Sequence, residues 1–308
     1  MLAQGLPVPA NREAAERMVA AVERAGACAA ITAVVRGVPT VGLEGEELER
    51  FLRREARKVS ARDLASAVAE GADGATTVAA ALALATLAGV SVFATGGIGG
   101  VHRRVPAESG SSTAAHDESA DLLELSRCPV VVVCAGAKSI LDLPATYERL
   151  ETLGVPVIGL GTSELPGFYT AETGIALSTR VEGADEVARI FEAHRALRRA
   201  TAILVVQPPP REAALDGATV DAAVARALRL ADRDGVRGAA LTPYLLAAVE
   251  RETGGRSLRS NLALLEANAR LAGEIAVAIA ARHVAAGDET FSLAAFASAG
   301  AGDAHERD

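Results

Sequence analysis

Short apolar runs alternate along the chain with longer stretches in which apolar residues recur at helical spacing. The runs are rich in Val and Ala and hold no charged residue, which is typical of strands buried on both faces of a sheet. They predict strands at residues 28–35, 90–94, 130–134, 155–159 and 202–206. VPTVGL, which ends at Leu43, predicts the second strand of a hairpin.

The stretches between these runs predict helices at residues 11–26, 46–57, 63–70, 76–88, 146–153, 184–199, 220–234, 243–253 and 257–283. Helices that alternate with buried strands indicate an α/β fold with a largely parallel central sheet. Binding sites in such sheets form in the loops after the carboxyl ends of the strands. Polar residues in those loops are therefore the first candidates for function.

Residues 74–101 contain no charged side chain, a length that suffices to cross a bilayer. The run changes character at Gly89 and ends in VSVFA and a glycine cluster, which favours a buried helix leading into a buried strand. Residues 104–115 and 285–308 are rich in small and polar residues and predict flexible segments. We therefore expect one folded domain over residues 1–284.

Composition narrows the classes of function. Half of the 308 residues are hydrophobic, and 31 basic residues, scattered along the chain, face 39 acidic ones for a net charge of -8. This balance disfavours a nucleic-acid-binding protein. The first residues, MLAQGLPVPANREAAER, lack the pattern of a secretion signal, and three cysteines without metal-type spacing fit a reducing compartment. We expect a cytoplasmic protein that binds neither nucleic acid nor membrane.

The predicted strand at residues 90–94 leads into ATGGIGGVHR, a loop with four glycines. Glycines let a backbone approach a ligand closely and can turn several N–H groups toward an anion. The loop is not the dinucleotide fingerprint, because His102 takes the last glycine position of G-x-G-x-x-G counted from Gly97. A structural turn and a binding loop are both open on this motif. His102 favours binding, since imidazole hydrogen-bonds polar ligands and exchanges protons near neutral pH.

Two further polar motifs allow a functional and a structural interpretation. HDESAD, residues 116–121, holds three carboxylates that suit a divalent cation, but Asp117 or Ser119 also suits a helix cap, which the spacing favours. In RKVSARDL, Lys58 precedes Ser60, a suitable cap with Asp63 three residues on. A lysine near a helix start is typical of phosphate sites, and a solvated lysine is the alternative.

Lys138 follows the predicted strand in VVVVCAGAK. Lysine is seldom buried without a partner or a task, and the small residues around this one leave space for a ligand. Burial lowers the pKa of a lysine and gives a neutral amine that attacks carbonyl carbons. The residues alone thus favour a functional role for Lys138.

The chain resembles pseudouridine-5'-phosphate glycosidases from about residue 5 to residue 281. It carries, in their order and spacing, the segments KVSARDL, GATTVAAAL, VFATGGIGGVHR, SADLLEL, VVVCAGAKSILDLPATYERLETLGVPVIG, ELPGFY and TGGRSLRSN. Members of this family split the carbon–carbon glycosidic bond of pseudouridine 5'-phosphate into uracil and ribose 5-phosphate, or run the reverse reaction. The resemblance implies an α/β/α sandwich, nucleotide catabolism, a divalent metal that is typically Mn²⁺, and a homotrimer.

The resemblance also implies roles for single residues. Lys138 stands where the family has a lysine that forms a Schiff base with C1' of ring-opened ribose. A C-glycoside has no leaving oxygen to protonate, so the iminium group supplies the electron sink that the cleavage needs. Lys58 matches a lysine at the ribose phosphate. The remaining matches are Thr76, Thr77 and Ser119 as further phosphate partners, Asp117 as the metal's direct protein ligand, and His102 and Asn261 at the uracil ring.

The amino-terminal end departs from the family pattern. Members carry a strand, the motif E-S-T, a histidine and a glycine before the segment that is GLPVPAN here, and Gln4 stands where the histidine is usual. The family's first strand and its proton-shuttling glutamate would fall upstream of Met1. A misplaced start or a truncation is favoured over a natural paralogue, because a lost strand exposes unpaired edge groups. A chain without this glutamate is expected to lose about 10² to 10⁴-fold in rate.

Two other functions stay open on the sequence. A non-catalytic sugar-phosphate or nucleotide binding paralogue would keep Lys58, the glycine loop and Asp117 without the proton shuttle. A member of the family acting on another C-nucleoside or sugar phosphate is also open, because the base pocket depends on loops that the sequence does not position. We expect the glycosidase, with pseudouridine 5'-phosphate, uracil and ribose 5-phosphate as its small-molecule ligands.

Overall fold

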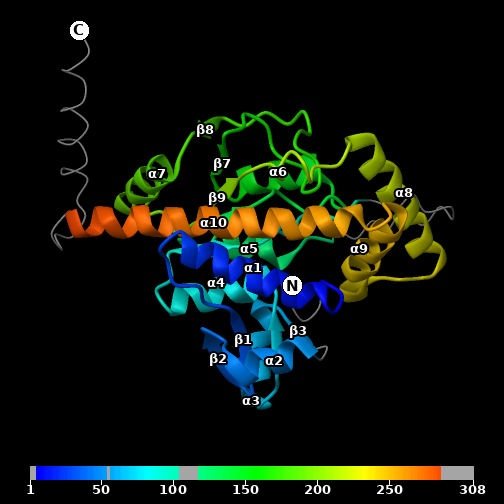
Figure 1. The fold of residues 1–308 in the computed structure, drawn as a ribbon, viewed down its shortest axis with the longest axis horizontal. Coiled ribbons are helices and arrows are strands. Elements are labelled where there is room, and N and C mark those ends of the chain that lie inside the picture. Colours follow the sequence, from blue (N-terminus) through cyan, green and yellow to red (C-terminus); the bar gives the residue numbers. More distant parts are fainter. Residues whose placement is uncertain (1–4, 54–55, 104–116, 286–308) are drawn as a thin grey trace, which may run out of the picture.

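The computed structural model describes residues 5–53, 56–103 and 117–285, whose strands form two sheets (Figure 1). The larger sheet has five parallel strands in the order β5-β6-β9-β7-β8. Its strands are β5 (Val92–Ala94), β6 (Val131–Cys134), β7 (Val157–Leu160), β8 (Thr179–Val181) and β9 (Ile203–Val206). The predicted parallel sheet is confirmed.

The smaller sheet is mixed and has the order β2-β1-β4-β3. Its strands are β1 (Thr32–Val35), β2 (Val38–Val41), β3 (Arg57–Val59) and β4 (Gly74–Thr76). β1 and β2 form the predicted hairpin, while β3 runs parallel to β4 with Lys58 opposite Ala75 and Val59 opposite Thr76. This pairing sets Lys58 beside the end of β4.

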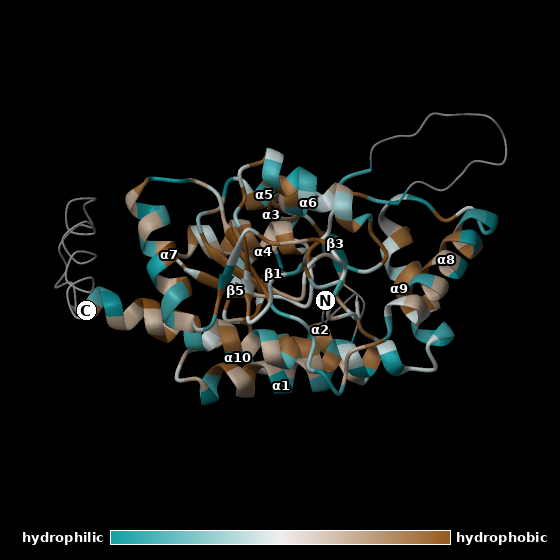
Figure 2. Cartoon of the chain, turned by 90° about the horizontal axis from the view of Figure 1, so that it is seen from above, coloured by the Kyte–Doolittle hydropathy of each residue, from teal (hydrophilic) through white to brown (hydrophobic). Residues whose placement is uncertain are grey.

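The larger sheet is apolar on both faces because helices cover both. Along β6, Val132 and Cys134 join one hydrophobic cluster, while Val131 and Val133 join the other. Figure 2 shows apolar segments gathered in the middle of the molecule, between the helices. Leucines of α5 (Ala120–Leu125) and α6 (Leu143–Thr152) belong to the first cluster; α7 (Ala184–Ala196) and the second half of α10 (Arg256–Ala285) supply the second. The expected α/β/α sandwich is therefore confirmed.

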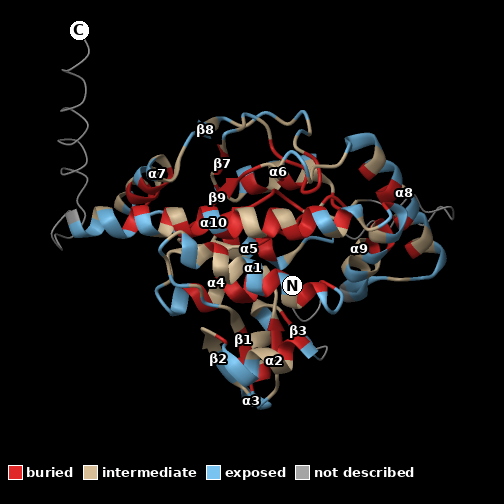
Figure 3. Cartoon of the chain, in the orientation of Figure 1, coloured by how far each residue is buried: buried red, intermediate tan, exposed pale blue. Residues whose placement is uncertain are grey.

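The longest helix, α10, crosses the molecule and is buried along its middle but exposed toward its carboxyl end (Figure 3). α1 (Ala10–Arg24) lies beside it. The two helices come close at Gly273, where an added Cβ would lie 2.7 Å from Cβ of Ala25. The amino-terminal helix is thereby packed against α10.

Three strands were not predicted, namely β3, β4 and β8. Each has three residues, and the charged residues of β3 and β8 hide the apolar pattern. The helix predicted over residues 46–57 is wrong at its end, because Arg57 begins β3. The helix predicted over residues 76–88 begins at residue 78 in the structure, because β4 extends to residue 76. Helices not yet placed are α2 (Gly45–Arg53), α3 (Leu64–Ala69), α4 (Val78–Leu87), α8 (Gly217–Arg233) and α9 (Leu241–Glu252).

The uncharged run at residues 74–101 forms β4, α4, β5 and the glycine loop. Within the described part of the chain, no helix combines the length and the apolar character that crossing a bilayer needs. The expected order of a buried helix and a strand is confirmed, but only the helix is buried, since β5 is an edge strand whose residues are half-buried. The two segments predicted to be flexible, residues 104–115 and 285–308, lie outside the described residues, apart from residue 285.

The buried His194 of α7 predicts a loss of stability on the acid side. Its Nε2 lies 2.9 Å from the Thr201 carbonyl oxygen, and burial lowers the pKa of the imidazole. Below about pH 6.5 this histidine binds a proton in the unfolded chain but stays neutral in the folded chain. The free energy of unfolding therefore decreases as the pH is lowered. Urea unfolding at about pH 7.5 and about pH 5.5 measures this loss.

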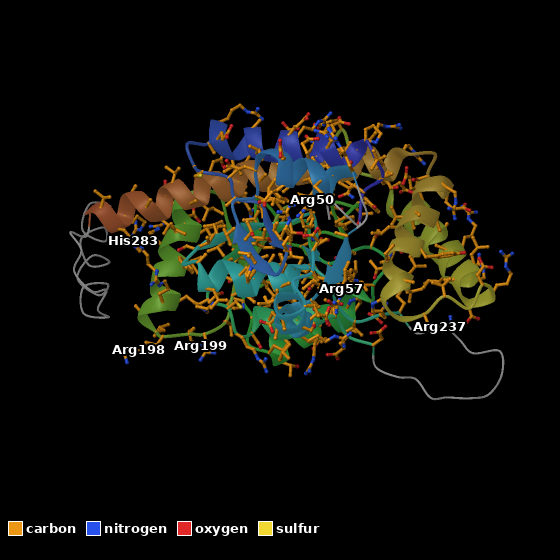
Figure 4. The ribbon with its side chains drawn as sticks, turned by 90° about the horizontal axis from the view of Figure 1, so that it is seen from below. Arg50, Arg57, Arg198, Arg199, Arg237 and His283 are labelled. Carbon is orange, nitrogen blue, oxygen red and sulfur yellow. The ribbon has the colours of Figure 1, made fainter. Side chains whose placement is uncertain are left out.

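His194→Gln is expected to reduce the acid-side loss, since the amide does not titrate. His283→Gln is the matched control, because His283 is exposed near the end of α10 (Figure 4). An equal reduction in both variants would contradict the assignment to His194.

Candidate active site

A cavity of about 760 Å³ lies between the two sheets, the glycine loop and α10. All eight residues singled out in the sequence line it: Lys58, Thr76, Thr77, His102, Asp117, Ser119, Lys138 and Asn261. They come from segments far apart in the chain, and the fold brings them together at the ends of β3, β4, β5 and β6. Their individual roles stay predictions.

Lys138 lies in the loop after β6. Its backbone N–H donates to the Ile98 carbonyl oxygen at 3.1 Å, which ties this loop to the glycine loop. The side chain is half-buried, and burial is the main cause that lowers the pKa of its amine. The charge of Asp121 opposes this shift and the charge of Lys58 adds to it. A neutral amine is therefore more accessible here than on a solvated lysine.

The glycine loop packs closely against its neighbours. An added Cβ at Gly99 would meet the Ser119 hydroxyl, and one at Gly97 would lie 2.6 Å from the ring of Phe168. The N–H groups of Ile98, Gly99, Val101 and His102 all donate to protein acceptors. Of the two interpretations that the motif left open, these four amides fit the structural turn, because they are not free to bind an anion.

Gly136 faces the glycine loop from the loop after β6. Its φ is +88°, and an added Cβ would meet the Pro166 carbonyl oxygen. We expect Gly136→Ala to lower the free energy of unfolding by roughly 2–4 kcal/mol, through backbone strain and this clash. Urea unfolding measures the loss.

Gly174→Ala is the control, since Gly174 also has a positive φ of +76° but has open space around it. Gly174→Ala should lower the free energy of unfolding through backbone strain alone, by about 1 kcal/mol. Equal costs for both variants would contradict the predicted clash.

His102 and Asp117 meet at the rim of the cavity. His102 Nε2 lies 3.9 Å from Asp117 Oδ2, and the backbone N–H of His102 donates to the Asp117 carbonyl oxygen at 2.9 Å. The imidazole is 17% exposed and the carboxylate 53%. Burial lowers the pKa of His102 although Asp117 raises it, so the imidazole is neutral at neutral pH. It can therefore both donate and accept a hydrogen bond.

The carboxylates of residues 117–121 separate in space. Ser119 caps α5, as the spacing favoured, and Glu118 pairs with Arg149 at 3.0 Å. Asp121 is buried and accepts backbone hydrogen bonds. The described residues hold no group of three His, Cys, Asp or Glu side chains suited to a metal ion. A cation here would have Asp117 as its carboxylate ligand, a set that suits ions retaining several waters.

Lys58 and the start of α4 form another side of the cavity. Thr77 is the N-cap of α4 and accepts from the Ala80 N–H, and Thr76 donates to the Thr32 carbonyl oxygen. The side chain of Lys58 is exposed, and its ammonium makes no hydrogen bond or ion pair with a described residue. Its ammonium is thus available to an anionic ligand near a helix start.

Asn261 enters the cavity from α10. Its side chain is buried, and its Oδ1 has no hydrogen-bond partner among the described residues. An added Cβ at Gly96 would lie 3.3 Å from this oxygen. A buried acceptor without a donor is costly, so Oδ1 is suited to an N–H group of a ligand.

Other residues that shape the site were not predicted. Asn268 of α10 is fully buried; its Nδ2 donates to the Thr95 carbonyl oxygen at 2.8 Å, and its Oδ1 accepts from Gln207 at 2.9 Å. These bonds fix the end of β5 against α10 and β9. An asparagine among the apolar residues of a long helix was the available signal. The cavity also continues as an apolar region lined by Met18, Val22, Ile31, Val92 and Ala272.

The chain matches a known protein family and solved structures with a similar fold. The model of the indigoidine synthase A like protein family matches residues 1–278, and the chain belongs to this family. The solved structures agree. An indigoidine synthase A-like protein from Thermotoga maritima has a TM-score of 0.81 and 38% identity, covering 90% of this chain and 89% of its own.

More closely similar relatives carry the name pseudouridine-5'-phosphate glycosidase. The protein of that name from Gemmatimonas aurantiaca is 63% identical over 280 residues, 91% of this chain and 89% of the relative. Its namesake from Herpetosiphon aurantiacus is 50% identical, covering 91% and 90%. A prealnumycin C-glycosynthase, solved in complex with ribulose 5-phosphate, has a TM-score of 0.80 and 41% identity over 88% of both chains. The resemblance seen in the sequence motifs is confirmed.

Proposed function

We propose that this protein reversibly cleaves the carbon–carbon glycosidic bond of pseudouridine 5'-phosphate. The observation that carries the proposal is that the half-buried amine of Lys138 shares one cavity with Lys58 and Asn261. The cavity thus combines a nucleophile, a free cation for a phosphate and an unpaired acceptor for a base. Relatives named for this activity, at up to 63% identity, support the same substrate.

The chemistry is simplest to follow in the direction of synthesis. The Lys138 amine adds to the C1' aldehyde of open-chain ribose 5-phosphate, and water leaves as the iminium forms. C5 of uracil adds to this carbon and then loses its proton, after which the 4'-hydroxyl closes the ring and displaces the amine. Cleavage runs these steps backward and consumes one water. The lowered pKa of Lys138 favours the amine that the addition needs.

The remaining residues bind and orient the substrate. In this proposal, the phosphate is bound by Lys58, Thr76, Thr77 and Ser119, and the uracil ring accepts hydrogen bonds from, and donates them to, His102 and Asn261. All six residues line the cavity, which supports these roles. Asp117 would hold a divalent cation, for which Mn²⁺ is the proposed ion, and the cation would supply positive charge beside the substrate. The homotrimer implied by the resemblance is part of the proposal, and light scattering measures it.

Turnover tests the proposal directly. Purified protein incubated with pseudouridine 5'-phosphate and Mn²⁺ should release uracil, which chromatography quantifies. Pseudouridine without the phosphate should react far more slowly, because Lys58 then has no anion to bind. Folded protein that releases no uracil under these conditions would contradict the activity.

One observation favours a second candidate, a binding protein for sugar phosphates without catalysis. Among the described carboxylates that line the cavity, Asp63, Glu118 and Asp121 are engaged by protein partners. Of the described carboxylates in the cavity, this leaves Asp117 to face a ligand, and the described lining offers no glutamate without a protein partner to shuttle protons. Calorimetry that shows binding of ribose 5-phosphate without uracil release would support this candidate.

A further inference from the structure

Asp121 joins three segments that surround the cavity. It lies in the first turn of α5 and is only 5% exposed. Its Oδ1 accepts the Ala79 N–H at the start of α4 at 2.9 Å, and its Oδ2 accepts the Gly99 N–H of the glycine loop at 2.8 Å. One side chain thus sets the relative position of α5, α4 and the glycine loop.

The two hydrogen bonds require a carboxylate. Each oxygen faces a separate backbone donor, so an amide at this position would turn its NH₂ group toward one of the two N–H groups. The negative charge also lies at the amino-terminal end of α4, where the helix dipole favours an anion. A buried charge still needs a nearby opposite charge, since burial is costly for an unpaired ion.

The glycine loop connects Asp121 to Lys138, whose backbone N–H donates to the Ile98 carbonyl oxygen in the same loop at 3.1 Å, and both side chains line the cavity. The groups whose charges act on the Lys138 amine are Asp121 from α5, Lys58 from β3 and Cys134 from β6. Burial raises the pKa of the Cys134 thiol to about 12, so the thiol is neutral. Among the described carboxylates, Asp121 therefore supplies the negative charge that Lys138 faces.

We propose that Asp121 is a positioning residue for Lys138: it holds the glycine loop and the start of α4 around the cavity and balances the charge of the lysine. A role of Asp121 in catalysis rests on the proposed function, because it requires that Lys138 is the nucleophile. The effect of Asp121 on the amine does not depend on any substrate. Without the negative charge of Asp121, Lys138 should lose its proton at a lower pH. Without the two hydrogen bonds, the loop that carries His102 should become less rigid.

Chemical labelling of Lys138 tests the charge without a substrate. The rate of acetylation by acetic anhydride is measured against pH and resolved to Lys138 by mass spectrometry, in wild type and in Asp121→Asn. The midpoint should shift to lower pH in the variant, with several-fold more labelling near neutral pH. Asp121→Glu keeps the charge and should keep the wild-type midpoint.

Asp142→Asn is the matched control, because Asp142 is also a helix-capping carboxylate, accepts the Ala145 N–H at 3.0 Å and lies four residues from Lys138. Its midpoint should equal that of wild type. An unshifted midpoint in folded Asp121→Asn, or an equal shift in Asp142→Asn, would overturn the proposal.

Asp121→Ser gives the same readout if Asp121→Asn does not fold. Failure of both to fold, while Asp142→Asn folds, would also overturn the proposal, because Asp121 would then serve folding alone. Absence of uracil release by wild type would count against the proposed function and would leave the labelling result intact.

Discussion

Replacing Lys138 by Ala is expected to abolish uracil release from pseudouridine 5'-phosphate, with kcat falling by about 10³-fold or more. The amine is the group that forms the covalent bond, and the other residues of the cavity only bind and orient. The loop should keep its place, because the hydrogen bond to Ile98 comes from the backbone of residue 138. Steady-state release of uracil measures the effect.

Lys138→Arg separates the amine from its charge. Guanidinium keeps the positive charge that faces Asp121 but does not form an imine, so this variant should be as inactive as Lys138→Ala. Calorimetry should show that both still bind ribose 5-phosphate, since Lys58 is intact. Substantial turnover by Lys138→Arg would show that the lysine acts through its charge alone.

Lys58→Ala is expected to raise KM for pseudouridine 5'-phosphate by about 10- to 100-fold, with a smaller effect on kcat. Lys58 has no protein partner among the described residues, so its ammonium is free to pair with the phosphate. A hydrogen bond to a charged group contributes about 1.5–3 kcal/mol, which corresponds to this range. The loss should weaken at high salt, because an exposed lysine is screened.

Arg57→Ala is the control for Lys58. Arg57 precedes it in β3, is exposed and pairs with Glu70 at 2.7 Å (Figure 4). Removing it takes the same charge from the same strand, so KM should stay near the wild-type value. Equal increases in KM for both variants would indicate a general effect of surface charge and contradict a phosphate contact by Lys58.

Much of the site could be predicted because its residues sit where strands end. Lys138 follows an apolar run that forms β6, and the glycine loop follows the run that forms β5. The two runs form neighbouring parallel strands, so their carboxyl ends meet at one edge and bring the two loops together. The role of Ser119 as a cap follows from local spacing, and it was also predicted.

Features that depend on contacts between distant segments could not be predicted. In the sequence, Asp121 is one of several carboxylates in an acidic stretch. Only the fold shows that it accepts hydrogen bonds from the backbone N–H groups of Ala79 and Gly99. The motif of the glycine loop left open whether its amides face a ligand, and only the fold shows that several of them donate to other segments of the chain. β3 and β4 have three residues each, too few for a periodic pattern, although they position Lys58.

Borohydride trapping tests the central role of Lys138 most directly. Ribose 5-phosphate is incubated with the protein and sodium borohydride, and the protein is then digested and mapped by mass spectrometry. The predicted result is a secondary amine at Lys138, with the mass of ribose 5-phosphate less one water plus two hydrogens, and none at Lys58. Folded wild-type protein that binds ribose 5-phosphate yet gives no adduct at Lys138 would contradict the imine mechanism.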